Sequence, residues 1–131
     1  MPEKETLERA EEDREEGKAP TTQAGEFVRE EIEHVREGKH GARSTTQAIA
    51  IGLSKARRSG VKLKPPKRAK ASTRRQAARD SREGRSGRVA RPSGRRSRAT
   101  LQALKREGRG AASREALSRQ ARATARRRRA R

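Results

Sequence analysis

STTQAIAIGLSKARRSGVKL, residues 44–63, holds the densest cluster of large apolar side chains in the chain. Ser44 begins this stretch and Gln47 follows three positions later, a spacing typical of a capping box at the start of a helix. Basic residues fall in the predicted last turn, where the negative end of the helix dipole favours cations. Gly60 suits the left-handed conformation just past a helix, and Val61 can then fold back onto the last turn. The stretch therefore predicts a helix that ends before Gly60.

A second helix is predicted over residues 21–37, because its apolar residues recur every three or four positions and Gly38 follows as a stop. Two helices joined by a short linker form an antiparallel hairpin. We expect this hairpin to span residues 20–63, which is near the lower size limit for a domain that folds alone. We therefore expect that it becomes fully ordered as a homodimer through the hairpin or when nucleic acid is bound. The side chains predicted to face one another are Phe27, Val28, Ile32 and Val35 from one segment and Ile49, Leu53, Val61 and Leu63 from the other.

The composition limits how much of the chain can form a core. Of 131 residues, 27% are hydrophobic and 41% are charged, so one small folded unit with disordered flanks is expected. The absence of cysteine excludes disulfides and thiolate metal sites. The longest apolar run, Ala48–Ile51, is too short to span a bilayer, and residues 1–10 lack the apolar core of a signal peptide. We therefore expect a soluble cytoplasmic protein with no membrane partner.

Charge is distributed unevenly along the chain. Residues 1–41 carry 13 acidic and 7 basic side chains, whereas residues 42–131 carry 4 acidic and 30 basic ones. A half this basic attracts polyanions and releases their counterions, and nucleic acid is the commonest such partner. These shifts in composition predict an acidic arm over residues 1–19, the hairpin over 20–63, a basic proline-containing linker over 64–72 and an Arg-rich tail over 73–131.

The tail has helix punctuation but few large apolar residues. Thr73 with Gln76 forms a second capping box for a helix that would end at Glu83, before Gly84. Two further helices are predicted, one from Ser97 to about residue 107 and one from Ser113 toward Arg129. Isolated helices this short are marginal in water, so we expect coil that becomes helical when phosphates neutralise the arginines. The fold class predicted is all-α: a small hairpin with an acidic arm and a largely disordered or conditionally helical tail.

Residues suited to catalysis or metal binding are sparse. Glu30, His34 and Glu37 can share one helix face at a spacing seen in metal sites, but glutamate is frequent in this segment and such spacing arises readily by chance. No nucleophile–base set and no phosphate-cradling glycine loop can be assembled from the sequence. We therefore predict a protein that is not an enzyme, with no catalytic residue, no metal and no cofactor.

The binding chemistry is more informative, because the basic residues are mainly arginine, whose guanidinium fork suits phosphate. Trp and Tyr are absent and a single Phe is present, so a stacking platform for single strands is missing. The expected mode is contact with the phosphate backbone, with weak sequence selectivity and strong salt dependence. The residues predicted to make these contacts are Lys55, Arg57, Arg58, Lys62, Lys64, Lys67, Arg68, Lys70, Arg74, Arg75, Arg126, Arg127, Arg128 and Arg129.

The segment VREGKHGARSTTQAIAIGLSKARRSGVKL, residues 35–63, combines an R-E-G-K stop, a basic Ser/Gly linker and the string Q-A-I-A-I-G-L-S-x-A. In these features it resembles a family of small basic bacterial proteins of unknown function. The resemblance implies a bacterial setting and brings no catalytic residue or ligand. The Arg-rich segments after residue 71 lie outside it and are similar, in composition only, to the tails of bacterial histone-like proteins.

Together these observations favour a non-enzymatic, weakly sequence-selective DNA-binding protein, nucleoid-associated or compacting, that contacts phosphates through Arg and Lys. A first alternative is an RNA-binding protein associated with ribosomal RNA. A second is a protein-interaction adaptor in which the hairpin docks on a partner and the basic tail tethers it to polyanions.

Overall fold

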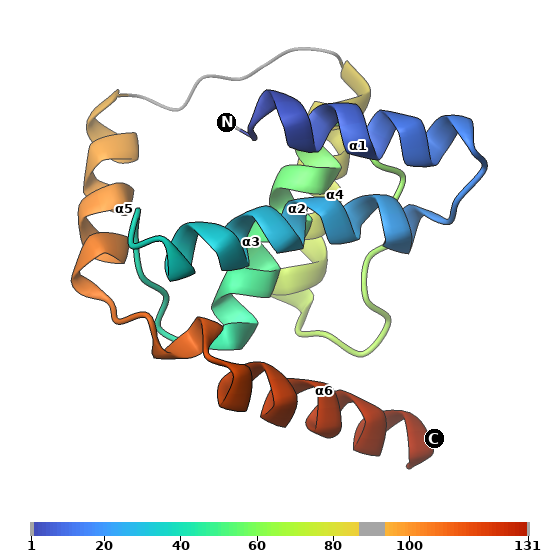
Figure 1. Ribbon diagram of the computed structural model, residues 1–131. Coiled ribbons are helices and arrows are strands. Elements are labelled where there is room, and N and C mark those ends of the chain that lie inside the picture. Colours follow the sequence, from blue (N-terminus) through green and yellow to red (C-terminus); the bar gives the residue numbers. More distant parts are fainter. Residues whose placement is uncertain (1, 87–93, 131) are drawn as a thin grey trace. The chain divides into compact units, whose positions relative to one another are not determined.

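The computed structural model describes residues 2–86 and 94–130, and every regular element in these ranges is a helix (Figure 1). The all-α prediction is therefore confirmed. The elements are α1 (Lys4–Glu15), α2 (Pro20–Arg36), α3 (Thr45–Arg58), α4 (Ala71–Ser86), α5 (Gly94–Arg106), the short 3-10 helix η1 (Gly110–Ala112) and α6 (Arg114–Arg129). None of the described helices has the length and apolar character needed to cross a bilayer.

The chain divides into two compact units, and both α2 and α3 contribute to each of them. The first unit consists of Met1–Glu30 and Ala50–Arg91, and the second of Glu31–Ile49 and Pro92–Arg131. The two helices of the predicted hairpin are present, but their antiparallel pairing stays a prediction. The division into arm, hairpin, linker and tail likewise stays a prediction.

The core of the first unit is built mainly from small side chains. Phe27 is fully buried and clusters with Ala24, Ala56 and Val61, while Leu53 packs against this cluster. Gly52 permits a close approach of α3 to α2, because a Cβ at that position would lie 2.6 Å from the Cα of Val28. Alanine and glycine thus let helix backbones come together where the chain has few large apolar residues to fill a wider gap.

Helix α1 contributes to this core through Ala10, whose surface is 7% exposed. Its outer side is charged and carries ion pairs within the helix, such as Arg9 with Glu5 at 2.6 Å. At the end of α1 the backbone reverses at Gly17, and Gln23 of α2 donates from its side-chain amide to the carbonyl oxygen of Lys18. The interpretation of residues 1–19 as a free acidic arm is therefore not confirmed.

Helix starts follow the predicted capping chemistry at two positions. The Gln47 N–H donates to Ser44 Oγ at 3.1 Å, and Gln47 Oε1 accepts from the Arg43 N–H at 2.6 Å. Ser113 Oγ accepts from the Ala116 N–H at 3.1 Å at the start of α6. These bonds satisfy backbone donors that a helix start leaves without partners, which fixes where α3 and α6 begin.

Helix ends at Gly38 and Gly60 have the geometry of the Schellman motif. Both glycines have positive φ, +78° and +100°. The N–H of Val61 donates to the carbonyl of Ala56 at 3.0 Å, which confirms the predicted fold-back at the end of α3. The N–H of Lys39 donates in the same way to the carbonyl of His34 at 3.0 Å, so the chain reverses directly after α2.

The basic segment after residue 70 differs from expectation in its helix boundaries. Thr73 lies inside α4, and α4 continues through Gly84 to Ser86, so the predicted end at Glu83 is wrong. Gly84 does not end the helix but allows close packing. A Cβ there would clash with the carbonyl oxygen of Arg57, so the glycine lets the end of α3 approach α4. Helix α5 begins at Gly94 instead of at Ser97, whereas α6 covers the predicted segment. The predicted change from coil to helix on phosphate binding stays a prediction.

Candidate nucleic-acid interface

Basic residues at the end of α3 have partners inside the first unit. Asp80 of α4 is only 2% exposed, and it accepts hydrogen bonds from Ser54 Oγ at 2.8 Å and from Arg58 Nε at 3.0 Å. Gln76 of α4 supplies a third donor at 3.0 Å. Arg58, which the sequence assigned to phosphate contact, thus joins α3 to α4 through a buried carboxylate.

Arg57 is more deeply enclosed, with 7% of its surface exposed. Its guanidinium donates to the backbone carbonyls of Leu63 and Lys64 at 3.4 and 3.1 Å, and so holds the segment that leaves α3. Burial lowers the pKa of Arg57 because desolvation disfavours the charged form, and the nearby Asp80 carboxylate opposes that effect. This guanidinium is a structural element of the first unit.

Lys55, the third basic residue near the end of α3, lies 3.4 Å from the buried carboxylate of Glu30 on α2. Glu30 also accepts from the backbone N–H of Glu3 at 2.6 Å. These contacts connect α2 to α3 and to the start of α1 within the first unit, so Lys55 also has an internal partner.

The remaining basic residues assigned from the sequence are exposed, and they lie in three places. One group occupies the loop between α3 and α4, a second lies in the first turns of α4, and a third ends α6 in the second unit. These exposed residues are Lys62, Lys64, Lys67, Arg68 and Lys70 of the loop, Arg74 and Arg75 of α4, and Arg126, Arg127, Arg128 and Arg129 of α6.

Helix α6 presents an arginine row that sequence reasoning had recognised only at its end. Four exposed arginines recur at spacings of three, four and three residues, which places them along one side of a helix. None of the four makes an ion pair within the described part of the chain. Glu115 lies at the start of the same side. The spacing was visible in the sequence, and it is the signal that would have found the first two members. We call this row the α6 arginine face: Arg119, Arg122, Arg126 and Arg129.

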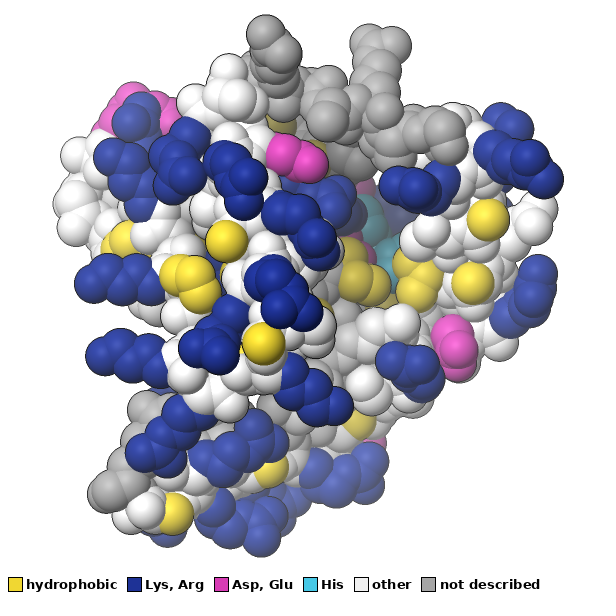
Figure 2. All heavy atoms as spheres, turned by 180° about the vertical axis from the view of Figure 1, so that it is seen from behind, with side chains coloured by type: hydrophobic (Ala, Val, Ile, Leu, Met, Phe, Trp, Pro, Cys, Tyr) yellow, Lys and Arg dark blue, Asp and Glu magenta, His cyan; other side chains and the backbone are white. Residues whose placement is uncertain are grey.

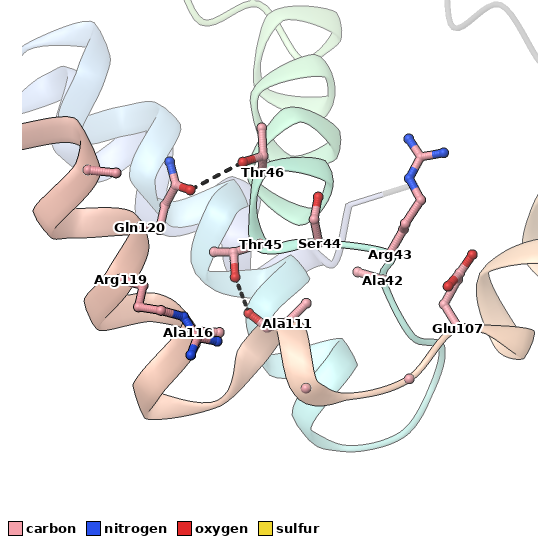
Figure 3. A pocket seen from close by; sticks show the side chains of 13 residues that line it. Ala42, Arg43, Ser44, Thr45, Thr46, Glu107, Ala111, Ala116, Arg119 and Gln120 are labelled. Carbon is pink, nitrogen blue, oxygen red and sulfur yellow. Dashed lines mark hydrogen bonds between the residues drawn. The ribbon is translucent and has the colours of Figure 1, made fainter. Parts of the chain in front are cut away.

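The less exposed side of α6 carries small or apolar residues such as Ala116 and Leu117. Two hydrogen bonds link the start of α3 to the α6 region within the second unit (Figure 3). Thr46 Oγ1 is 3.2 Å from Gln120 Oε1, and Thr45 Oγ1 donates to the Ala111 carbonyl at 2.5 Å. The contact with Thr46 therefore places Gln120 of α6 toward the start of α3, while the residues of the α6 arginine face are exposed.

A groove of about 670 Å³ runs beside these bonds. Its walls come from residues 42–46 before and at the start of α3, from the segment around Glu107 and from α6 (Figure 3). Arg43 and Arg119 are its basic lining residues, and Ser44, Thr46 and Gln120 supply neutral polar groups. The groove is therefore open, and its lining is mixed, because alanines and the carboxylate of Glu107 lie beside the polar and basic side chains.

The surface as a whole is basic. Figure 2 shows one face, on which Lys and Arg side chains are widely spread and Asp and Glu are few. Because the formal net charge is +20, this excess extends well beyond the residues that have acidic partners. In general, a basic surface that binds a polyanion does so mainly through the release of condensed counterions.

A family of unknown function (DUF6496) matches residues 22–68, which include most of α2, all of α3 and the first part of the following loop. This range contains the segment whose resemblance to a family of unknown function was drawn from the sequence. No curated protein and no solved structure matches the chain. Helices α4, α5 and α6 lie outside the matched range.

Proposed function

We propose that the protein is a non-enzymatic nucleic-acid-binding protein that contacts phosphates through exposed Arg and Lys, with DNA as its main target. The observation that carries the proposal is the α6 arginine face, where four exposed guanidinium groups lie on one side of a helix without ion-pair partners in the described part of the chain. At a rise of about 1.5 Å per residue, this row spans about 15 Å, enough to follow several phosphates of one strand.

The exposed basic loop between α3 and α4 provides a second set of phosphate contacts on the first unit. Contacts of this kind position a protein on nucleic acid but do not read base identity. The proposal therefore includes weak sequence selectivity, a cytoplasmic location on the nucleoid of a bacterial cell, and helices in the basic segment that gain stability when phosphates neutralise their arginines.

The decisive measurement is a salt titration of the full chain with a fluorescent DNA duplex. We expect the logarithm of the binding constant to fall linearly with the logarithm of the salt concentration. A variant with the α6 arginine face changed to glutamine should lower the slope by about 3 to 4 units, since each phosphate contact contributes about 0.9. Glutamine keeps a good helix propensity, so α6 should remain folded.

The matched control changes four loop lysines to glutamine, Lys62, Lys64, Lys67 and Lys70, which removes the same charge elsewhere. A larger loss in the α6 variant supports the arginine face as the main contact. Equal losses would show that net charge alone drives binding, and no binding at low salt would overturn the proposal.

Recovery of the protein from cells distinguishes DNA from the alternatives. Loss of the associated material on DNase treatment supports DNA, and enrichment of ribosomal RNA would favour the ribosome-associated alternative. Retention of a protein partner after both nucleases would favour the adaptor.

A further inference from the structure

Both histidines of the chain lie against one buried carboxylate in the second unit. Glu31 of α2 is 1% exposed, and the side chains of His34 and His40 are 14% and 10% exposed. His34 Nδ1 is 4.0 Å from Glu31 Oε1, and His40 Nε2 is 3.3 Å from Glu31 Oε2. One donor atom from each residue lies within 4.8 Å of the other two.

Local structure explains how His40 reaches this place although a helix ends between it and His34. Gly38 takes the left-handed conformation, and the Lys39 N–H then bonds to the His34 carbonyl. The reversal brings the His40 ring to an edge-to-face position 5.8 Å from the His34 ring, measured between centroids. Glu31 and His34 share a face of α2 because they are three residues apart.

The loop that carries His40 is fastened to the end of α5 within the second unit. The Gly41 N–H donates to the Leu104 carbonyl at 2.8 Å, and the Ala42 N–H donates to the Gly108 carbonyl at 3.1 Å. A Cβ on Gly41 would clash with the carbonyl oxygen of Glu107, so this approach needs glycine. The position of His40 is thus set by backbone bonds on both sides of the loop.

The hydrogen bonding of His40 also defines its tautomer. Nδ1 lies 2.8 Å from the Gly41 carbonyl oxygen, and since a carbonyl can only accept, Nδ1 carries the proton. Nε2, the nitrogen near Glu31, then has a free lone pair when the ring is neutral. Metal-binding histidines are commonly oriented by this kind of bond from the other ring nitrogen to a backbone carbonyl.

We propose that Glu31, His34 and His40 bind one divalent transition-metal ion, with Zn²⁺ as the ion that best suits the ligands. Donor atoms at about 2.0 to 2.1 Å from a tetrahedral zinc lie about 3.3 Å apart, which is the separation of His40 Nε2 and Glu31 Oε2. The donor atom of His34 lies within 4.8 Å of the other two and would have to move closer to them when the ion binds. Two imidazoles and one carboxylate favour zinc over magnesium or calcium, which prefer oxygen ligands.

The site differs from the metal pattern weighed in the sequence, Glu30, His34 and Glu37. Glu30 is engaged by Lys55, and Glu37 is paired with Lys39 at 3.4 Å. The bound ion would clamp the His40 loop onto α2 and leave one coordination position for water. Nucleic-acid binding by the exposed arginines does not depend on it.

The test uses untagged full-length protein freed of metal by a chelator and titrated with Zn²⁺ by calorimetry. We expect one ion per chain and at least 100-fold weaker binding in the double variant His34→Gln/His40→Gln. The matched control is Glu37→Gln, which removes an exposed carboxylate next to the site and should leave zinc affinity unchanged.

A second measurement keeps the test independent of how well the variants fold. Because the chain has two histidines, imidazole NMR signals of the wild-type protein report directly on the site. Zn²⁺ should shift both sets of imidazole signals with one-to-one stoichiometry. Unshifted signals, or zinc binding that is equal in a folded double variant, would overturn the metal site.

Discussion

The ends of α3 and α6 are both basic last turns, yet their arginines have different environments. At the end of α3, Arg57 is buried against backbone carbonyls and Arg58 bonds to the buried Asp80. At the end of α6, Arg126–Arg129 are exposed and have no ion-pair partner in the described part of the chain. The comparison teaches that a cluster of arginines in the sequence does not by itself indicate exposed guanidinium groups, because the fold can offer them internal acceptors.

The scarcity of large apolar residues explains why the first unit uses charges internally. Its core contains one phenylalanine and several alanines. Alanine side chains are small, so each of them buries little apolar area and contributes little hydrophobic stabilisation. Hydrogen bonds to charged groups contribute about 1.5 to 3 kcal/mol each, so a carboxylate such as Asp80 adds substantially to the link between α3 and α4. Helix α6 shows the opposite case, because its arginines extend into solvent.

The largest expected effect follows from removing the carboxylate that joins α3 to α4. Asp80→Ala should lower the free energy of unfolding by about 3 kcal/mol, because it removes a buried carboxylate that accepts hydrogen bonds from three side chains. DNA binding at low salt should not weaken, since Arg58 is released from its acidic partner. Urea denaturation followed by circular dichroism measures the stability.

Asp80→Asn is the matched control, since it keeps the shape and one acceptor oxygen and should lose about half as much stability. A loss below about 0.5 kcal/mol for Asp80→Ala would contradict a stabilising role of the network.

An intermediate effect is expected when the buried arginine is replaced. Arg57→Met keeps much of the apolar stem and removes the bonds to the carbonyls of Leu63 and Lys64, so unfolding should become easier by about 2 kcal/mol. The salt slope of DNA binding should stay unchanged.

The exposed counterpart, Arg122→Gln, should leave stability unchanged and lower the slope by about 0.9. Equal effects of the two substitutions on the slope would remove the distinction between the two helix ends.

The smallest expected effect concerns Glu26, which lies near Asp13 in the first unit. Burial, and then the neighbouring Asp13 carboxylate, raise the pKa of Glu26. A raised pKa means that the folded state holds this proton more tightly than the unfolded chain. The contribution therefore favours folding below the ordinary value of 4.5 and is lost as the pH rises through the folded-state value.

Glu26→Gln should accordingly raise stability near neutral pH by at most about 1 kcal/mol and have little effect below pH 4.5. Its amide can donate to Asp13, whose buried Oδ2 has no hydrogen-bond partner among the described residues. Urea midpoints measured across this pH range test the prediction. A variant that is less stable than the wild type at neutral pH would contradict it.

Local signals in the sequence predicted several features correctly. Ser44 and Ser113 cap α3 and α6, and Gly60 with Val61 ends α3 as expected. These features depend on residues within a few positions of one another, so the required side-chain and backbone groups can be read directly. Gly84 was misinterpreted as a stop, because its missing Cβ is needed by a chain segment more than twenty residues away.

The sequence by itself determined the helical class, the capped starts of two helices and the excess of positive charge, because each arises from local preference or composition. Only the tertiary structure decided that Arg57 and Arg58 have internal partners, that the four arginines spaced along one side of α6 are exposed, and that His40 lies against Glu31. The physical reason is that these properties depend on contacts between donors and acceptors that are far apart in the sequence. Backbone reversals and the close packing of helices determine which of these groups come into contact.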